Sequence, residues 1–234
     1  RRPPRSTPSN SSAASDVYKR QIVVLADWIT IDCSDKLDST VAENLSLLKK
    51  RAKRLAALIE GIREYCELGS IQAKEQVDLN KLVQQIVAEI NPPENIRIVI
   101  LNELPTVVGS KTRLKQVFKN LLTNAVQYMD KPKGEITVSC VEDGDFWKFS
   151  ICDNGPGIEE RHFRKIFKIF QTLHTRDEME TAGLGLAIVK KVVDMYGGTV
   201  TVESEVGKGT TFSFTFPRTF DLASKESEAT ATIS

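Results

Sequence analysis

The sequence predicts an α+β protein, a two-layer sandwich in which helices cover a mixed β-sheet, preceded by a long helix of the dimerisation type. Three observations support this fold class. Strand-like and amphipathic helical segments are mixed after about residue 76, the last strands are joined in pairs by short turns, and a heptad repeat precedes residue 70. We therefore expect a helical region followed by one sandwich domain.

The bulk composition limits the classes of protein to consider. The 234 residues are 41% apolar and 27% charged, as in an ordinary globular chain of one or two domains. Lys and Arg (32) balance Asp and Glu (31), so no basic surface for nucleic acid is expected. The apolar run IVVLADWITI contains Asp27 and is too short to span a membrane. Four cysteines without paired spacing predict reduced, buried thiols in a cytoplasmic protein.

Residues 1–21 do not resemble the rest of the chain. This segment is rich in proline, serine and basic residues, and its only apolar side chains larger than alanine are Val17 and Tyr18. It cannot bury enough surface to offset the entropy of ordering. It could be a natural disordered tail, a targeting peptide without an apolar core, or foreign sequence joined to a truncated gene. We favour the third interpretation.

Residues 22–70 predict a truncated helical region. Apolar residues recur at alternating steps of four and three, the spacing of a helix that packs along a partner helix. Thr40 and Glu43 have capping-box spacing, and Gly69 ends the helix. The pattern fits either one helix of a globular core or half of a dimerising four-helix bundle, and we favour the bundle. The positions of the repeat are Val41, Leu45, Leu48, Ala52, Leu55, Ile59, Ile62 and Cys66.

Residues 76–217 predict the sandwich, and residues 218–234 a disordered tail. Asp78 is suited to cap a helix that ends before two prolines, and Gly144 with Asp145 predicts a hairpin. The expected helices are 78–90, 112–129, 160–170 and one that starts at Gly183. The expected strands are 96–101, 135–143, 147–153, 198–205 and 209–216.

Three glycine clusters lie in this domain: DNGPGI at 153–158, AGLGLA at 182–187 and GKGTTF at 207–212. Asp153 ends a strand, and its carboxylate suits the exocyclic amine of a purine, while Gly155 and Gly157 let backbone approach a flat ring. Gly183 and Gly185 open a helix, where free backbone N–H groups suit phosphates. A single glycine cluster more often makes only a turn, but the order of the three favours a nucleotide site.

Two asparagines add a fourth motif. Asn120 and Asn124 are four residues apart, so they share one face of a helix. Their carbonyl oxygens suit Mg²⁺ that already carries water and phosphate oxygens. The alternative is that both are solvent-exposed, although asparagine is a poor helix former and two of them in an apolar helix need a reason.

In this order, the four motifs resemble the catalytic, ATP-binding domain of sensor histidine kinases, in a superfamily that also holds gyrases, mismatch-repair ATPases and a chaperone. The resemblance implies ATP and Mg²⁺ as ligands, with Asn120 on the metal, Asp153 on the adenine amine, and Thr210 supporting Asp153 or its water near the adenine. It implies that Phe167 and Phe170 anchor a lid at about 171–182. The residues it assigns to ATP are Asn120, Asn124, Gln127, Tyr128, Asp153, Gly155, Gly157, Ile158, Phe170, Gly183, Leu184, Gly185, Leu186 and Thr210.

Two departures from the family pattern concern the terminal phosphates. The family often has lysine where this chain has Gln127, and arginine where it has Thr172. Both changes remove positive charge from a site whose work is largely electrostatic, which affects the expected rate more than the binding. Thr181 stands where the family often has a further glycine, a change of little expected consequence.

The resemblance also implies a function. A sensor histidine kinase transfers the ATP γ-phosphoryl group to a histidine on a dimerisation helix, as a homodimer, for relay to a response regulator receiver domain. That histidine would fall near Ala13, where this chain has none, and neither His162 nor His174 is followed by an acid. We therefore expect a kinase that needs an acceptor helix from elsewhere. The alternative is a nucleotide-binding or dimerisation module without transferase activity. A hydrolytic ATPase is disfavoured, because it needs a glutamate at Asn120.

Overall fold

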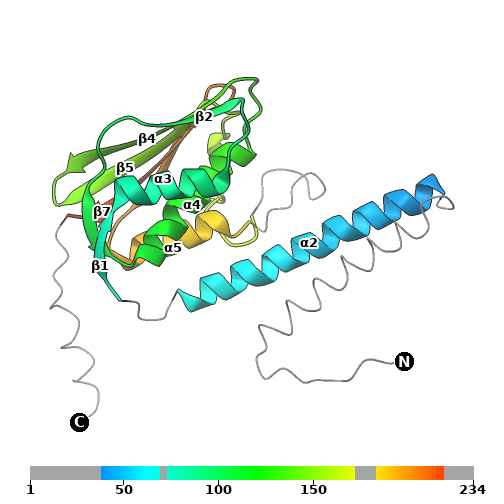
Figure 1. Cartoon of the computed structure of the whole chain (residues 1–234), viewed down its shortest axis with the longest axis horizontal. Coiled ribbons are helices and arrows are strands. Elements are labelled where there is room, and N and C mark those ends of the chain that lie inside the picture. The colour runs from blue at the N-terminus through cyan, green and yellow to red at the C-terminus, as the bar shows by residue number, and fades with distance from the viewer. Residues whose placement is uncertain (1–37, 69–72, 172–182, 219–234) are drawn as a thin grey trace, which may run out of the picture. The chain divides into compact units, whose positions relative to one another are not determined.

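The computed structural model describes residues 38–68, 73–171 and 183–218 (Figure 1). These residues fall into two compact units: 38–66 with 183–184, and 67–68 with 73–171 and 185–218. The elements are α2 (Ser39–Glu67), β1 (Glu75–Asp78), α3 (Leu79–Ile90), β2 (Ile96–Ile100), β3 (Thr106–Gly109), α4 (Lys111–Gln127), β4 (Gly134–Asp143), β5 (Phe146–Asp153), α5 (Gly185–Met195), β6 (Val200–Glu205) and β7 (Gly209–Pro217). The expected leader lies outside the described residues, as do all of the expected lid except Gln171 and all of the expected tail except Arg218.

Helix α2 is the described part of the helical region. It begins at Ser39, one residue before the expected start, and ends at Glu67. The heptad positions Leu48, Leu55 and Ile59 are 47%, 60% and 45% exposed, so this apolar stripe is not part of the core of the chain. No described helix is long and apolar enough to cross a membrane.

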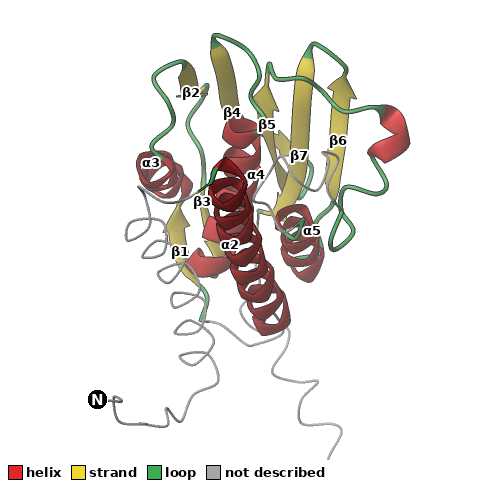
Figure 2. Ribbon diagram, turned by 90° about the vertical axis from the view of Figure 1, so that its right-hand side faces the viewer, coloured by secondary structure: helices red, strands yellow, loops and turns green. Residues whose placement is uncertain are grey.

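The second unit is the predicted sandwich. Five strands form a mixed sheet in the order β2-β4-β5-β7-β6, in which β2 and β4 are parallel and all other pairs are antiparallel. Helices α3, α4 and α5 lie along one face of this sheet (Figure 2). The α+β fold class with a mixed sheet covered by helices is therefore confirmed.

The core lies between the helices and the sheet. Phe118 on α4 meets Phe149 and Phe214 edge-on, with ring centroids 5.5 and 5.3 Å apart, and the last two rings stack at 5.1 Å. Leu114 lies four residues before Phe118 on α4 and Leu121 lies three residues after it, and both are 1% exposed. The apolar face of α4 is thus pressed against the middle of the sheet, which fixes the position of its polar residues.

Local sequence signals explain the ends of the helices. The Asp78 carboxylate accepts a bond from the Lys81 N–H, and Asn91 ends α3 in the left-handed region with φ 46°. The Ser110 hydroxyl caps α4 by accepting from the Arg113 N–H. Arg113, only 3% exposed, donates in turn to the carbonyl oxygen of Glu67 at 2.6 Å.

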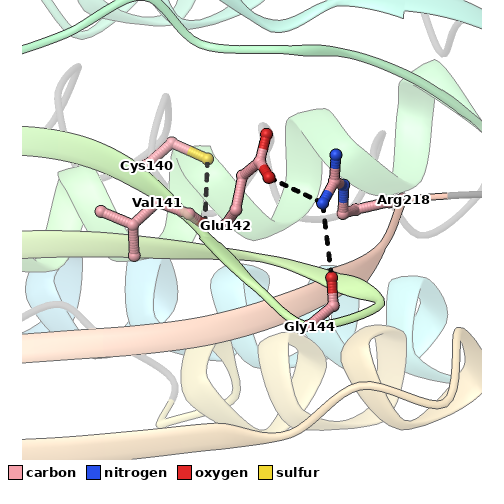
Figure 3. A network of polar contacts seen from close by, with 5 residues as sticks. All are labelled: Cys140, Val141, Glu142, Gly144 and Arg218. Carbon is pink, nitrogen blue, oxygen red and sulfur yellow. Dashed lines mark hydrogen bonds and ion pairs between the residues drawn. The ribbon is translucent and has the colours of Figure 1, made fainter.

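The end of β7 is clamped to the β4–β5 hairpin (Figure 3). Arg218 donates to the Glu142 carboxylate at 2.7 Å and to the Gly144 carbonyl oxygen at 3.5 Å. Its guanidinium also lies 4.9 Å from the centroid of the Trp147 ring. Gly144 has φ 59° with open space around it, as the predicted hairpin turn requires. The sequence alone did not single out this clamp.

Three expectations need correction. Residues 160–170 are not a helix but a 3₁₀ turn at Glu160–His162 followed by turns, because the segment has no side-chain cap and buries only Ile166. The antiparallel pair β1–β3 was missed, since each strand is four residues long. Of the described cysteines only Cys140 is buried, whereas Cys66 and Cys152 are exposed. Burial raises the pKa of the Cys140 thiol to about 12, so that thiol is unreactive at neutral pH.

Candidate nucleotide-binding site

Asp153 lies at the end of β5, where three neighbouring strands bring three polar residues into line. In the strand register, Asp153 pairs with Thr210, and Thr210 pairs with Ser204. The Asp153 Oδ1 atom accepts bonds from the N–H groups of Gly155 at 2.9 Å and Thr210 at 3.2 Å. Both bonds hold the carboxylate through one oxygen, and no described residue donates to Oδ2. This oxygen is therefore the acceptor that the site offers to a ligand.

The surroundings of Asp153 oppose its ionisation. Burial raises the pKa of this carboxyl above its usual range, the negative charge of Asp130 adds to the rise, and the bonds from Gly155 and Thr210 counteract it. A donor from a ligand would favour the ionised form, because it would replace the hydration that burial removed. A carboxylate of this kind is typical of a binding site rather than of a solvated surface.

The glycine loop after β5 touches the turn between β6 and β7 backbone to backbone. Gly157 has φ 75°, and a Cβ atom there would lie 2.2 Å from the Glu205 carbonyl oxygen. Gly209 has φ 127°, and its Cβ would lie 1.9 Å from the Asp153 carbonyl oxygen. The Gly207 N–H donates to the Pro156 carbonyl oxygen at 2.7 Å. Only glycine permits this approach, so the loop beside Asp153 has a fixed shape.

Helices α4 and α5 bring Asn120 and Gly185 together. The Asn120 amide donates from Nδ2 to the Gln116 carbonyl oxygen at 2.8 Å, one turn earlier on α4. This bond directs Oδ1 away from its own helix, and a Cβ atom at Gly185 would lie 2.7 Å from that oxygen. The first residue of α5 therefore leaves room for a carbonyl-type ligand atom beside free backbone N–H groups. This donor set fits Mg²⁺ that also carries water and phosphate oxygens.

The remaining residues that the sequence assigned to the site lie near Asp153, Asn120 or Gly185 in the chain. Asn124 is half-buried on α4 and its carbonyl oxygen accepts from Tyr128 N–H, which caps the helix just after Gln127. Ile158, Gly155 and Leu186 are partly or fully buried in the same unit. Gly183, with φ 65°, and buried Leu184 belong to the first unit of the chain.

The two phenylalanines expected at the lid differ from one another. Phe167 packs edge-on against Phe212, with ring centroids 6.3 Å apart, and so attaches its segment to β7. Phe170 is 51% exposed and has φ 62°, a rare backbone conformation for a bulky residue. Thr172, His174 and the remainder of the expected lid up to residue 182 lie outside the described residues.

The sequence did not predict two polar residues that lie near Asp153. The Ser204 hydroxyl accepts from the Ile158 N–H at the end of the glycine loop at 2.8 Å and donates to the Gly209 carbonyl oxygen at 2.7 Å. The Asn154 side chain accepts from the Glu135 N–H at 2.8 Å and donates to the Lys133 carbonyl oxygen at 3.1 Å, which ties the loop to the start of β4. The position of Asn154 between Asp153 and two glycines was the available signal, since asparagine commonly bonds to backbone in turns.

No cluster of three or more His, Cys, Asp or Glu residues that could hold a metal occurs within the described ranges.

Comparison with known proteins matches the same region. Residues 109–219 match the family described as histidine kinase-, DNA gyrase B-, and HSP90-like ATPase. The chain is 33% identical over 200 residues to cyanobacterial phytochrome A of Nostoc sp., covering 84% of this chain and 26% of that protein. It is 33% identical over 176 residues to sensor histidine kinase ZraS of Escherichia coli, covering 73% of this chain and 37% of that one. The chain thus spans about a quarter of the length of its phytochrome relative.

Solved structures show the same fold. Full-length ShkA in complex with AMPPNP superposes with a TM-score of 0.64 at 26% identity, covering 93% of this chain and 47% of that one. The histidine kinase ThkA in complex with response regulator protein TrrA superposes with a TM-score of 0.60 at 24% identity, covering 89% of this chain and 61% of that one. At this identity the second likeness concerns the fold alone.

Proposed function

We propose that this chain, which carries a catalytic ATPase domain of the sensor histidine kinase type, binds ATP with Mg²⁺. The domain belongs to the histidine kinase-, DNA gyrase B- and HSP90-like ATPase family. In this proposal it transfers the γ-phosphoryl group of ATP to a histidine on a dimerisation helix. A response regulator receiver domain would then take the phosphoryl group from that histidine. The proposal also includes a homodimer formed through the stripe on α2.

The observation that carries the proposal is the arrangement around Asp153. A half-buried carboxylate is held through one oxygen by two backbone N–H groups, beside glycines that lie close to neighbouring backbone. Such a site accepts hydrogen bonds from a flat ligand with an exocyclic amine, which is the chemistry of adenine. Complementary support comes from ShkA, whose structure contains AMPPNP.

The phosphates and the metal belong at the other end of the site. We assign Asn120 Oδ1 to Mg²⁺ and the N–H groups at the start of α5 to phosphate oxygens. When bound, Mg²⁺ neutralises the charge that the phosphates carry and that grows in the transition state. Asn120 cannot serve as a general base, because an amide does not take up a proton. The site therefore favours transfer to a histidine over activation of water.

Transfer needs an acceptor in line with the terminal phosphate. The bond from the γ-phosphorus to the bridging oxygen breaks, a bond to an imidazole nitrogen forms, and ADP leaves. His162 lies on the 3₁₀ turn after the glycine loop and not on a bundle helix, so we do not assign it this role. The acceptor in this proposal is a histidine followed by an acidic residue on a partner helix.

The experiment mixes the protein with Mg²⁺, labelled ATP and a synthetic amphipathic helix that carries a histidine followed by an acid. We expect acid-labile phosphate on the peptide and none on a peptide in which that histidine is alanine. ATP binding without any transfer would support the alternative, a nucleotide-binding module. The absence of ATP binding would contradict both.

A further inference from the structure

We propose that Ser204 is a positioning residue that fixes the direction of the hydrogen bonds around the nucleobase, so that the Thr210 hydroxyl presents only lone pairs and thereby sets how strongly the site discriminates between 6-amino and 6-oxo purines. The inference rests on the proposed function, because it concerns the base of the nucleotide. It concerns a residue to which neither the sequence nor the family resemblance gave a role.

The Ser204 hydroxyl has three neighbours and one proton. The backbone N–H of Ile158 donates to Ser204 Oγ at 2.8 Å. The Gly209 carbonyl oxygen, which can only accept, lies 2.7 Å from the same oxygen. The Thr210 hydroxyl lies 3.0 Å from it, and this contact alone allows either direction. Since the serine proton goes to the Gly209 carbonyl, the Thr210 hydroxyl must donate to Ser204.

This direction decides what Thr210 can do. Its single hydroxyl proton is used on Ser204, so it has none to give to Asp153 or to a ligand. The structure agrees, because Thr210 reaches Asp153 through its backbone N–H at 3.2 Å and not through its hydroxyl. Thr210 is only 5% exposed, so bulk water does not readily supply another partner for its hydroxyl.

The consequence concerns the end of the site that would take the nucleobase, which we call the base end and which contains Asp153, Gly157, Gly209 and Thr210. Its side chains offer acceptors only. Asp153 Oδ2 and the lone pairs of Thr210 Oγ1 can receive protons but cannot donate them. At position 6, an amino group donates to such a surface directly or through a water, whereas an oxo group would leave acceptor facing acceptor. At position 1 the pattern is reversed, because adenine has an unprotonated nitrogen there and a 6-oxo purine carries an N–H, so the direction of the Thr210 hydroxyl affects the two purines differently. A site built around donors in its ligand rejects analogues that lack them, because the polar groups of the site would then stay unpaired.

Removal of the Ser204 hydroxyl should change this selectivity. In Ser204→Ala, Thr210 loses its acceptor and its proton becomes free to turn toward Asp153 or a ligand. We expect the preference for ATP over inosine triphosphate, measured as the ratio of the two dissociation constants with Mg²⁺, to change about threefold to tenfold. The ratio falls where the freed proton serves the 6-oxo group and rises where it serves N1 of adenine. The phosphates of the two nucleotides are identical, so the ratio reports on the base alone.

Three further variants test whether the effect passes through Thr210. Ser204→Thr keeps the hydroxyl and should restore the ratio. Ser213→Ala is the matched control, because it removes another buried hydroxyl of the same sheet. This hydroxyl bonds to Ser150 at 2.9 Å and lies on the other face of β7. Its removal should leave the ratio of the two dissociation constants unchanged. In a Thr210→Val background, Ser204→Ala should produce no further change in the ratio.

The outcomes separate the inference from the function that it rests on. If the unaltered protein binds neither nucleotide, the proposed function fails. If it binds ATP but Ser204→Ala weakens both nucleotides equally, Ser204 has only a structural role and the inference is wrong. An equal change of the ratio with and without the Thr210 hydroxyl would also overturn it. Should Ser204→Ala not fold, Ser204→Cys, whose thiol is a weaker donor and acceptor, should also change the ratio, by a smaller factor.

Discussion

The two ends of the candidate site are built in different ways. At the base end, Asp153, Gly157 and Gly209 are fixed by strand register and by contacts between backbones. At the phosphate end, the close neighbours are side-chain atoms of helices, and Asn120 meets Gly185 through a flexible amide. A contact between backbones cannot relax without moving a strand, whereas a side chain can rotate. The base end should therefore be rigid before the ligand arrives, and the phosphate end should depend on the metal and the phosphates.

The largest expected effect is on stability, at the glycines. Gly157→Ala places a Cβ atom 2.2 Å from the Glu205 backbone at φ 75° and should lower the free energy of unfolding by about 3 kcal/mol or more. Gly144→Ala, at φ 59° in open space, should cost about 1 kcal/mol. Gly185→Ala meets only the Asn120 side chain and should cost less still. Urea denaturation measures all three, and equal losses would show that the two ends do not differ in rigidity.

Next in size is the loss of ATP binding in Asp153→Asn. The asparagine carbonyl can still accept from Gly155 and Thr210, but its amide would turn donors toward the amine of adenine. Loss of a charge-assisted bond corresponds to about 1.5–3 kcal/mol, or roughly tenfold to 150-fold in affinity. Titration calorimetry with ATP and Mg²⁺ measures it, and Cys152→Ser, an exposed neighbour on the other face of the strand, is the control. Unchanged ATP affinity in Asp153→Asn would contradict the assignment of Asp153 to the adenine amine.

A smaller effect is expected at the phosphate end. Asn120→Ala removes one neutral oxygen from the proposed magnesium site while water can take its place, so affinity for ATP should fall about threefold to tenfold. The fall should appear when Mg²⁺ is present and largely vanish when the metal is chelated. Calorimetry with and without Mg²⁺ tests this difference. A loss of the same size without the metal would mean that Asn120 does not act through Mg²⁺.

The smallest effect is a dependence on pH. The pKa of Asp153 is raised in the ligand-free protein, mainly by burial, and ligand binding favours the ionised form. As the pH falls, affinity for ATP should therefore begin to weaken at a higher pH than it would for a carboxyl with the usual pKa of 3.8. The Asp153→Asn variant, measured over the same pH range, removes the titration of the ligand itself from the comparison.

The same shift has a consequence for stability, with the opposite sign. A carboxyl whose pKa is raised by folding stabilises the fold when protonated. This contribution is present below the usual carboxyl pKa and is lost as the pH rises through the raised one. Replacing Asp153 with asparagine should therefore leave the ligand-free protein as stable as before at neutral pH, or more stable. Thermal unfolding checks this, and a large loss of stability would show that Asp153 mainly supports the fold.

The sequence predicted the strands around Asp153 better than it predicted the contacts between strands, for physical reasons. Asp153 followed a strand with clear alternation and preceded glycines, and the strand and hairpin were found where expected. Ser204 was missed because its role depends on which strands are neighbours in the sheet, and β7 lies between β5 and β6. The false helix at 160–170 had an apolar pattern, but only Ile166 is buried in it. Exposed Cys152 shows that thiol burial does not follow from spacing.

The central claim is that the base end of the site is formed independently of the phosphate end, and titration with adenosine tests it most directly. Adenosine has the base but no phosphates and needs no metal. The account predicts that adenosine binds equally well to the unaltered protein and to Asn120→Ala, with or without Mg²⁺, and that Asp153→Asn abolishes this binding. If adenosine affinity instead depends on Mg²⁺, or falls as far in Asn120→Ala as in Asp153→Asn, the two ends form one unit and the claim is contradicted.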